Sequence, residues 1–238
     1  MEGLPTYDYD ASLKRWKEIL TSETDNRKRA EMMLKDAVTL LDEGRILFDP
    51  ILTCEALGEV EKAGAYDLQA EAYNRIGTFW GKTYPALSLS IWRAAERLYD
   101  DLHKEQELDS VRLNLALSCF LTADKYECLD SQIADEYRNE ARVIVQSISG
   151  PISDNSTVPY FKLVKGTILG DVILLKQART FYEHNALWDL AISCLDEEIR
   201  LALDNDKRQE ALPLIRLVRE CAIKLDDYDF ANEIEEKT

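Results

Sequence analysis

The side chains that could act as acids, bases or metal ligands are few in this chain and lie far apart. It has only two histidines, His103 and His184. Neither has a glutamate three residues before it, as the Glu-x-x-His pairs of di-iron helical bundles require. The acidic runs 196–198 and 226–227 could bind a metal ion, but such runs are more often found on solvated helix faces or at helix starts. We therefore interpret both runs as solvated and both histidines as exposed groups at helix ends.

Sequence motifs of common enzyme classes are missing as well. No H-E-x-x-H, G-x-S-x-G, Walker A or G-x-G-x-x-G sequence occurs. We expect no catalytic residues, no cofactor and no metal. A site of the Ser-His-Asp type can still assemble from distant residues in space, so an enzyme with a pocket between helices stays open as an alternative.

The cysteines indicate a reducing compartment. They are odd in number, widely spaced and without a C-x-x-C pair, and each falls in or beside an apolar helical stretch. This pattern predicts reduced thiols in the core of a cytoplasmic protein. Residues 1–10 do not resemble a secretory signal, and apolar runs such as 172–175 are far too short to span a membrane. The five cysteines are Cys54, Cys119, Cys128, Cys194 and Cys221.

The composition favours a helical protein that does not bind nucleic acid. Of the 238 residues, 46% are hydrophobic and 31% are charged, and the counts of Gly (9) and Pro (6) are low. So few breakers predict long helices joined by short turns. The net charge of −16 repels a phosphate backbone. The acidity either serves solubility or provides a docking face for a basic partner.

Helical periodicity of the apolar residues extends through most of the chain. The stretch 147–159, rich in Ser, Gly, Pro and Asn, is the one linker signal. An aromatic residue followed by Ala or Leu starts a helical run about every 40 residues, at Tyr84, Tyr126, Trp188 and Tyr228, with one longer step that contains this linker. The first predicted helix follows Asp10. The further predicted helices cover 27–43, 45–61 (bent at Pro50), 66–80, 84–102, 108–121, 126–147, 160–184 (with a break near Gly170), 187–203, 206–225 and 228–236.

A period in this range indicates stacked helical hairpins, and the residues resemble tetratricopeptide repeats. Helix A of that family carries a large, apolar, small and aromatic pattern, which Tyr73, Ile76, Gly77 and Trp80 match. Three later helices carry equivalent sets. These are Leu113, Ala116 and Phe120, then Leu175, Ala178 and Tyr182, then Ile215, Val218 and Ala222. The helix B signature is clear at Trp188/Ala191 and Tyr228/Ala231, looser at Tyr84/Ala86 and degenerate at Tyr126/Leu129.

The resemblance extends from about residue 66 to the C-terminus, with departures. Leu117, Arg179 and Arg219 stand where the family usually has a small residue, and the repeat is longer than the family's typical length of about 34 residues. Acidity and repeat length are also similar to SNAP-type vesicle-fusion adaptors. The resemblance implies an all-α fold, a right-handed α-solenoid of antiparallel helical hairpins (a TPR-like superhelix). We expect N-terminal hairpins over 1–148, a loop over 149–159 and C-terminal hairpins over 160–238, together forming one continuous domain.

The resemblance also implies a function. Such solenoids are non-enzymatic scaffolds that bind a protein or peptide segment along the concave helix A surface. The alternatives are a SNAP-like adaptor or a subunit of a larger assembly, which would use convex or edge surfaces, and an unrecognised enzyme. We expect no membrane insertion. On the family's register, the partner-binding candidates are Glu71, Asn74, Thr78, Lys82, Asn114, Ser118, Lys176, Thr180, His184, Arg216 and Glu220.

Overall fold

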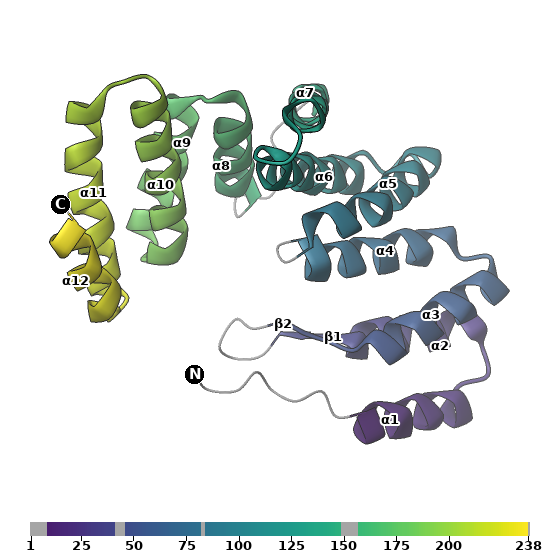
Figure 1. Ribbon diagram of the computed structural model, residues 1–238. Coiled ribbons are helices and arrows are strands. Elements are labelled where there is room, and N and C mark those ends of the chain that lie inside the picture. The colour runs from purple at the N-terminus through teal and green to yellow at the C-terminus, as the bar shows by residue number, and fades with distance from the viewer. Residues whose placement is uncertain (1–8, 41–45, 82–83, 149–156, 238) are drawn as a thin grey trace. The chain divides into compact units, whose positions relative to one another are not determined.

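The fold is helical, as the periodicity predicts. The computed structural model describes residues 9–40, 46–81, 84–148 and 157–237, and most helices pack against their neighbours along the chain (Figure 1). The helices in this part of the chain are α1 (Tyr9–Ser22), α2 (Asn26–Ala37), α3 (Pro50–Ala63), α4 (Tyr66–Gly81), α5 (Pro85–Asp101), α6 (Glu105–Tyr126), α7 (Ser131–Ser147), α8 (Thr157–Leu169), α9 (Val172–His184), α10 (Trp188–Asp204), α11 (Arg208–Lys224) and α12 (Tyr228–Lys237).

A small β-hairpin interrupts the helices between α2 and α3. Strand β1 (Val38–Leu40) pairs antiparallel with β2 (Ile46–Phe48), with Thr39 opposite Leu47. The prediction that one helix reaches residue 43 and the next begins at residue 45 is therefore wrong. The β-branched pair Val38-Thr39 suits an extended backbone better than a helix end.

The start of α3 follows from Asp49 and Pro50. The Asp49 side chain accepts a hydrogen bond from the Leu52 amide at 3.0 Å, which caps the helix. Pro50 occupies the first turn, where its missing N–H has no intrahelical acceptor to lose. The proline thus begins α3, and the predicted bend at Pro50 is wrong.

The chain divides into two compact units, Met1–Tyr137 and Arg138–Thr238, and the division falls inside α7. Most of the linker expected over 149–159 lies outside the described residues, and α8 already begins at Thr157. In the first unit, apolar side chains of α1 to α4 form one core around the buried residues Ile19, Met33, Leu34, Leu52, Val60 and Leu68. In the second unit, α8 to α11 form a core around Leu175, Tyr182, Ala191, Cys194, Leu195 and Val218.

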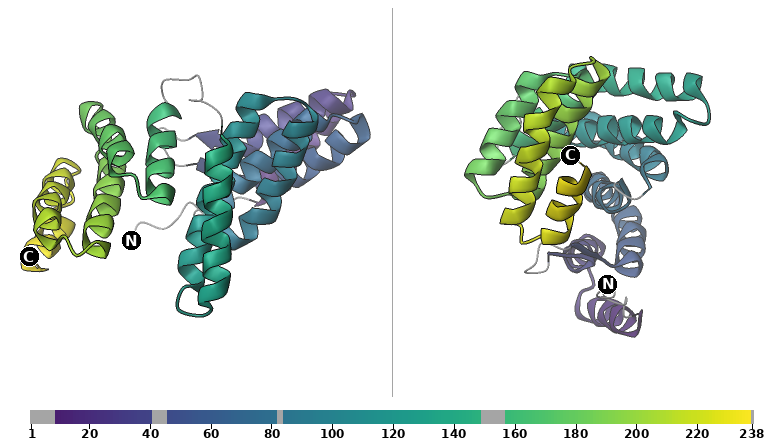
Figure 2. Two further views of the ribbon diagram at one scale, coloured as in Figure 1. Left: turned by 90° about the horizontal axis from the view of Figure 1, so that it is seen from above. Right: turned by 60° about the vertical axis from the view of Figure 1, so that its left-hand side comes forward.

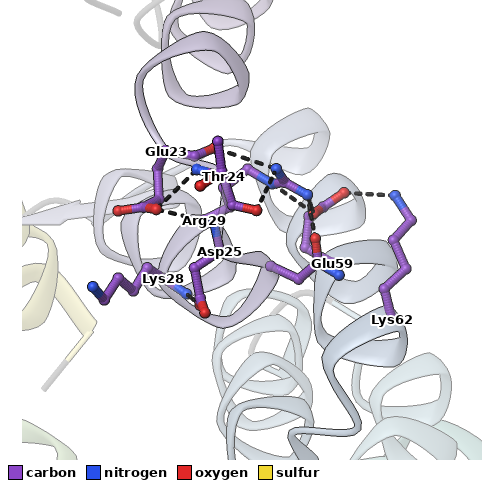
Figure 3. Close-up of polar contacts among 8 residues, drawn as sticks. Glu23, Thr24, Asp25, Lys28, Arg29, Glu59 and Lys62 are labelled. Carbon is purple, nitrogen blue, oxygen red and sulfur yellow. Dashed lines mark hydrogen bonds and ion pairs between the residues drawn. The ribbon is translucent and has the colours of Figure 1, made fainter.

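A buried glutamate connects α2 and α3 in the first core. Glu59 on α3 is 4% exposed. Its Oε2 accepts from Arg29 Nε of α2 at 2.7 Å and its Oε1 from Lys62 Nζ at 2.6 Å (Figure 3). Arg29 also donates to the carbonyl oxygens of Glu23 and Thr24, in the turn between α1 and α2. Burial raises the pKa of Glu59, but the hydrogen bonds from Lys62 and Arg29 outweigh it, so the pKa lies below its ordinary value.

Within the described ranges, one type of turn joins helices at six places. In each turn a residue with positive φ follows the helix, and the next amide bonds the carbonyl five residues earlier, as from Leu187 to Tyr182 at 2.9 Å. This is the Schellman arrangement, which usually places glycine at the left-handed position. Here only two of the six residues are glycines. The six are Gly64, His103, Gly170, Ala186, Asp206 and Asp226.

Ala186 is the least suited of these residues, because a left-handed backbone crowds its Cβ and alanine has no polar side chain to compensate. We expect Ala186→Gly to raise the free energy of unfolding by about 0.5–1 kcal/mol. Urea unfolding of the full chain would measure the change. A loss of stability would contradict the left-handed turn, because glycine in an ordinary helical position is destabilising.

The approach of α4 to α5 depends on Gly77. A Cβ at this position would lie 2.7 Å from the ring of Trp92, which is itself 2% exposed. The side chain of Trp92 therefore occupies the space that any larger residue at position 77 would need. By contrast, a Cβ at Gly58, inside α3, would meet nothing within 4 Å.

The two glycines predict opposite effects of the same substitution. Gly77→Ala should lower the free energy of unfolding by about 1–3 kcal/mol, because overpacking against Trp92 exceeds the gain in helix propensity. Gly58→Ala is the matched control and should raise it by about 0.5–1 kcal/mol. Chemical unfolding of both variants checks the prediction. Equal stabilisation by both would mean that Gly77 is not needed for close packing.

Candidate functional site

One exposed face of α9 carries three of the predicted partner-binding residues. Lys176, Thr180 and His184 are exposed and follow one another at intervals of four, which places them on the same side of the helix. They line a hollow of about 620 Å³, together with Phe181 on α9 and Lys162 on α8. Figure 2 shows the helices of this unit, coloured green to yellow, from two further directions.

The hollow continues onto α11. Thr180 and His184 also line a second hollow of about 440 Å³, which includes Trp188 at the start of α10 and Glu220 and Lys224 on α11. The Lys224 ammonium lies 4.0 Å from the centre of the Trp188 ring, a cation–π contact. We call these two hollows together the α9 groove. The structure thus brings together four predicted residues, Lys176, Thr180, His184 and Glu220.

The α9 groove combines apolar surface with cations. Ile173 is 69% exposed and Phe181 is 37% exposed along it. Lys162 and Lys176 have no ion-pair partner in the part of the chain that the structure describes. The Thr180 hydroxyl donates to the Lys176 carbonyl at 2.8 Å and can still accept. Such a surface can bind a segment that presents apolar and acidic side chains.

The predicted residues on α4 lie in the other unit and have local partners. Glu71 pairs with Arg75 at 2.5 Å, and the Thr78 hydroxyl donates to the Asn74 carbonyl at 2.9 Å. Asn74 is half-buried, and its Oδ1 has no hydrogen-bond partner among the described residues. Thr78 and Phe79 beside it are exposed, which leaves this part of α4 accessible.

The remaining predicted partner-binding residues do not line the α9 groove. Ser118 on α6 is 4% exposed and accepts a hydrogen bond from Ser88 of α5 at 3.2 Å, so it is a core residue and cannot reach a partner in this arrangement. Asn114 on α6 is half-buried, and Arg216 on α11 is exposed but does not line the α9 groove. Lys82 lies outside the described residues.

The sequence analysis missed one feature of this unit, the buried glutamate of α10. The interpretation of 196–198 as solvated is wrong for Glu198, which is 2% exposed. Its Oε1 accepts from Arg179 Nε at 2.8 Å, whereas its Oε2 has no hydrogen-bond partner among the described residues. Burial raises the pKa of Glu198, and the nearby Arg179 opposes this only in part.

The other groups considered for chemistry are mostly where the sequence predicts them. His184 ends α9 and His103 lies in the turn after α5, and both are exposed. Three cysteines are buried as predicted, but Cys54 and Cys128 are exposed, so the prediction is wrong for these two. Within the described ranges, no three or more His, Cys, Asp or Glu side chains are grouped to hold a metal ion. No helix of these ranges has the length and apolar character needed to cross a membrane.

No family model matches the chain, and no curated protein or solved structure matches it. What the protein does must therefore be argued from its own geometry. That geometry offers an exposed groove on α9 and a buried carboxylate on α10, both in the second unit.

The two buried glutamates predict opposite pH dependences of stability. The folded-state pKa of Glu59 is lowered, so its contribution is present above the unfolded value near 4.5 and is lost as the pH falls through the folded value. The folded-state pKa of Glu198 is raised, so its contribution is present below the unfolded value and is lost as the pH rises. Relative to wild type, Glu59→Gln should therefore lower the free energy of unfolding most at neutral pH. Glu198→Gln should lower it least at neutral pH.

Urea unfolding of the wild type and both variants, at neutral pH and at about pH 4, measures these differences. The two variants serve as controls for each other, because each replaces a buried carboxylate by its neutral isostere. A difference of the same sign for both would contradict the assignment of one satisfied and one partly satisfied glutamate.

Proposed function

We propose that this protein is a non-enzymatic interaction scaffold and that the α9 groove binds a segment of a partner protein. The observation that carries the proposal is the alignment of Lys176, Thr180 and His184 along a hollow of about 620 Å³ that continues to Glu220. Exposed apolar side chains beside unpaired cations and hydroxyl groups are typical of peptide-binding grooves.

The proposed function also depends on how the helical hairpins are arranged. We infer antiparallel hairpins of the tetratricopeptide type that wind into a right-handed solenoid, with α9 and α11 as A helices and α10 and α12 as B helices. Support comes from Ala178 and Ala191, which are fully buried where α9 and α10 pack, as the family's small positions require. Three buried free thiols support a cytoplasmic location.

Arg179 gives a reason for one departure from that family. It replaces a small residue of the helix A pattern, and its guanidinium pairs with the buried Glu198. The guanidinium also pairs with Glu183 at 3.3 Å, one turn further along α9. The ion pairs with Glu183 and Glu198 thus allow the larger arginine side chain to remain between the two helices.

The test places a carboxylate in the middle of the groove. Thr180→Glu should weaken binding of an acidic partner segment by about tenfold or more, which corresponds to about 1.4 kcal/mol. Stability should change by less than about 0.5 kcal/mol, because Thr180 is exposed. A photoreactive residue at position 181 captures and identifies the partner, and titration calorimetry then measures its affinity.

Ser193→Glu on α10 is the matched control. Ser193 is also exposed, and its hydroxyl donates to the carbonyl four residues earlier at 3.1 Å, much as Thr180 does at 2.8 Å. If Ser193→Glu abolishes binding and Thr180→Glu does not, the groove is not the binding surface. The adaptor function, with binding on B-helix or edge surfaces, would then replace this proposal.

A further inference from the structure

The part of the α9 groove that borders α8 differs in charge from the rest of the chain. The polar side chains of this α8–α9 hollow are two lysines, a histidine, a glutamine and a threonine, and no Asp or Glu of the described residues lines it. The hollow on α11 includes Glu183 and Glu220, and a third hollow of this unit includes Glu198 and Glu210. Because the whole chain has a net charge of −16, a hollow without carboxylates is unusual here and favours an anionic ligand.

Three side chains of the α8–α9 hollow have hydrogen-bond donors available. Within the described ranges, the Lys162 ammonium on α8 and the Gln177 amide on α9 form no hydrogen bond or ion pair. Lys162 is half-buried, so its charge is partly desolvated. Lys176 lowers the pKa of the buried Glu198 but forms no ion pair with it, so its exposed ammonium keeps its donors.

The kind of donor favours a phosphoryl group over a carboxylate. An arginine fork matches the two oxygens of a carboxylate, and no arginine of the described residues lines this hollow. Two ammonium groups and an amide are separate donors. They suit the three terminal oxygens of a phosphoryl group, which carries a charge of about −1.5 to −2 at neutral pH.

The surroundings favour a single phosphorylated side chain over a nucleic acid or a free phosphate ion. The net charge of −16 repels the long row of charges on a nucleic acid. A single phosphoryl group interacts mainly with the charges within a Debye length, about 8 Å at physiological ionic strength. Ile173 and Phe181 are exposed and also line the hollow, and a free phosphate ion could not use these apolar contacts.

The spacing along α9 indicates how the bound segment is arranged. Ile173, Gln177 and Phe181 follow one another at intervals of four, so they lie in a row with steps of about 6 Å along the helix axis. In an extended segment, alternate residues point to the same face and are about 6.6 Å apart. A segment that runs along α9 can therefore place a phosphorylated residue at Gln177 and apolar residues at Ile173 and Phe181.

We propose that the α8–α9 hollow binds a phosphorylated side chain of a partner protein, with apolar residues two positions before and two positions after it. This inference rests on the proposed function, because it assigns the chemistry of the segment in the groove. The ammonium groups of Lys162 and Lys176 and the amide of Gln177 donate to the phosphoryl oxygens. Ile173 and Phe181 contact the two apolar side chains.

The probe is the peptide acetyl-Ala-Leu-Ala-phosphoserine-Ala-Leu-Ala-amide, and the same peptide with unmodified serine is its matched control. NMR titration of the isotope-labelled full chain should show the phosphopeptide binding about tenfold or more tightly than the control. A peptide with aspartate in place of phosphoserine should bind several-fold more weakly than the phosphopeptide, because a carboxylate has less charge and fewer oxygens. Moving both leucines next to the phosphoserine should also weaken binding several-fold, because they then point to the other face of the segment.

Lys162→Gln and Lys176→Gln should each weaken phosphopeptide binding by about tenfold and leave binding of the unmodified peptide unchanged. Lys165→Gln is the matched control, because Lys165 is also half-buried on α8 but does not line the hollow. Its ammonium lies 5.2 Å from the centre of the Phe161 ring. All three variants change the net charge equally, so equal losses in all three would show unspecific attraction and overturn the proposal.

Three further results would overturn the proposal. The first is equal binding of the phosphorylated and unmodified peptides. The second is binding of inorganic phosphate as tightly as the phosphopeptide, which would assign the hollow to the free ion. The third is binding of vesicles that contain phosphatidylinositol phosphates, lost in Lys162→Gln, by a protein that does not bind the phosphopeptide. That result would assign the hollow to a membrane surface.

Phosphatase treatment of the captured partner separates this inference from the proposed function. A partner that binds the groove equally well after treatment leaves the proposed function intact and overturns only the phosphoryl inference. A partner whose binding is not weakened by Thr180→Glu overturns the proposed function itself. Loss of binding after treatment and in Lys162→Gln, with Lys165→Gln unaffected, is the result that we expect.

Discussion

The close approach of neighbouring helices is the constraint on which the rest of the structure depends. Each helix can bury its apolar stripe only against another helix, and small residues set how near the two backbones come. Gly77 leaves room for the ring of Trp92, and Ala178 and Ala191 are fully buried where α9 and α10 pack. Because so little space remains inside each pair, any polar group on the buried stripe must find its partners within reach.

The two buried glutamates show both outcomes of that constraint. Glu59 is reached by Arg29 from α2 and by Lys62 from its own helix, so the carboxylate is charged and satisfied (Figure 3). Glu198 accepts a hydrogen bond from Arg179 alone, and its second oxygen lacks a partner among the described residues. Burial raises the pKa of both carboxylates. Two hydrogen-bonded cations outweigh it at Glu59, whereas Arg179 and the more distant charge of Lys176 do not outweigh it at Glu198.

The helices could be predicted from apolar periodicity. Some local departures from regular helix packing could not be predicted in this way. The sequence does not predict the β-hairpin because its apolar residues continue the helical spacing of α2, and Pro50 was interpreted as a bend within a helix although it begins α3. The left-handed turn at Ala186 has no glycine to mark it. Glu198 follows the buried Cys194 and Leu195 by four and three residues, a spacing that does place it on the buried stripe. That its Oε2 lacks a partner depends on which side chains reach across from α9, and periodicity contains no such information.

Lys176 lines the α9 groove and also acts electrostatically on the buried Glu198, whose pKa it lowers. The lysine is exposed, so its attraction for an anionic segment in the α9 groove acts through solvent and is screened over a Debye length of about 8 Å at physiological ionic strength. Glu198 is buried, and a buried charge is screened far less. Added salt should therefore weaken the attraction of Lys176 for a segment in the groove more than its effect on Glu198. An acidic segment that neutralises Lys176 in the groove would also offset the positive charge that lowers the pKa of Glu198. Binding of such a segment would then raise the pKa of Glu198 further, because the binding of the segment and of the proton are reciprocally coupled.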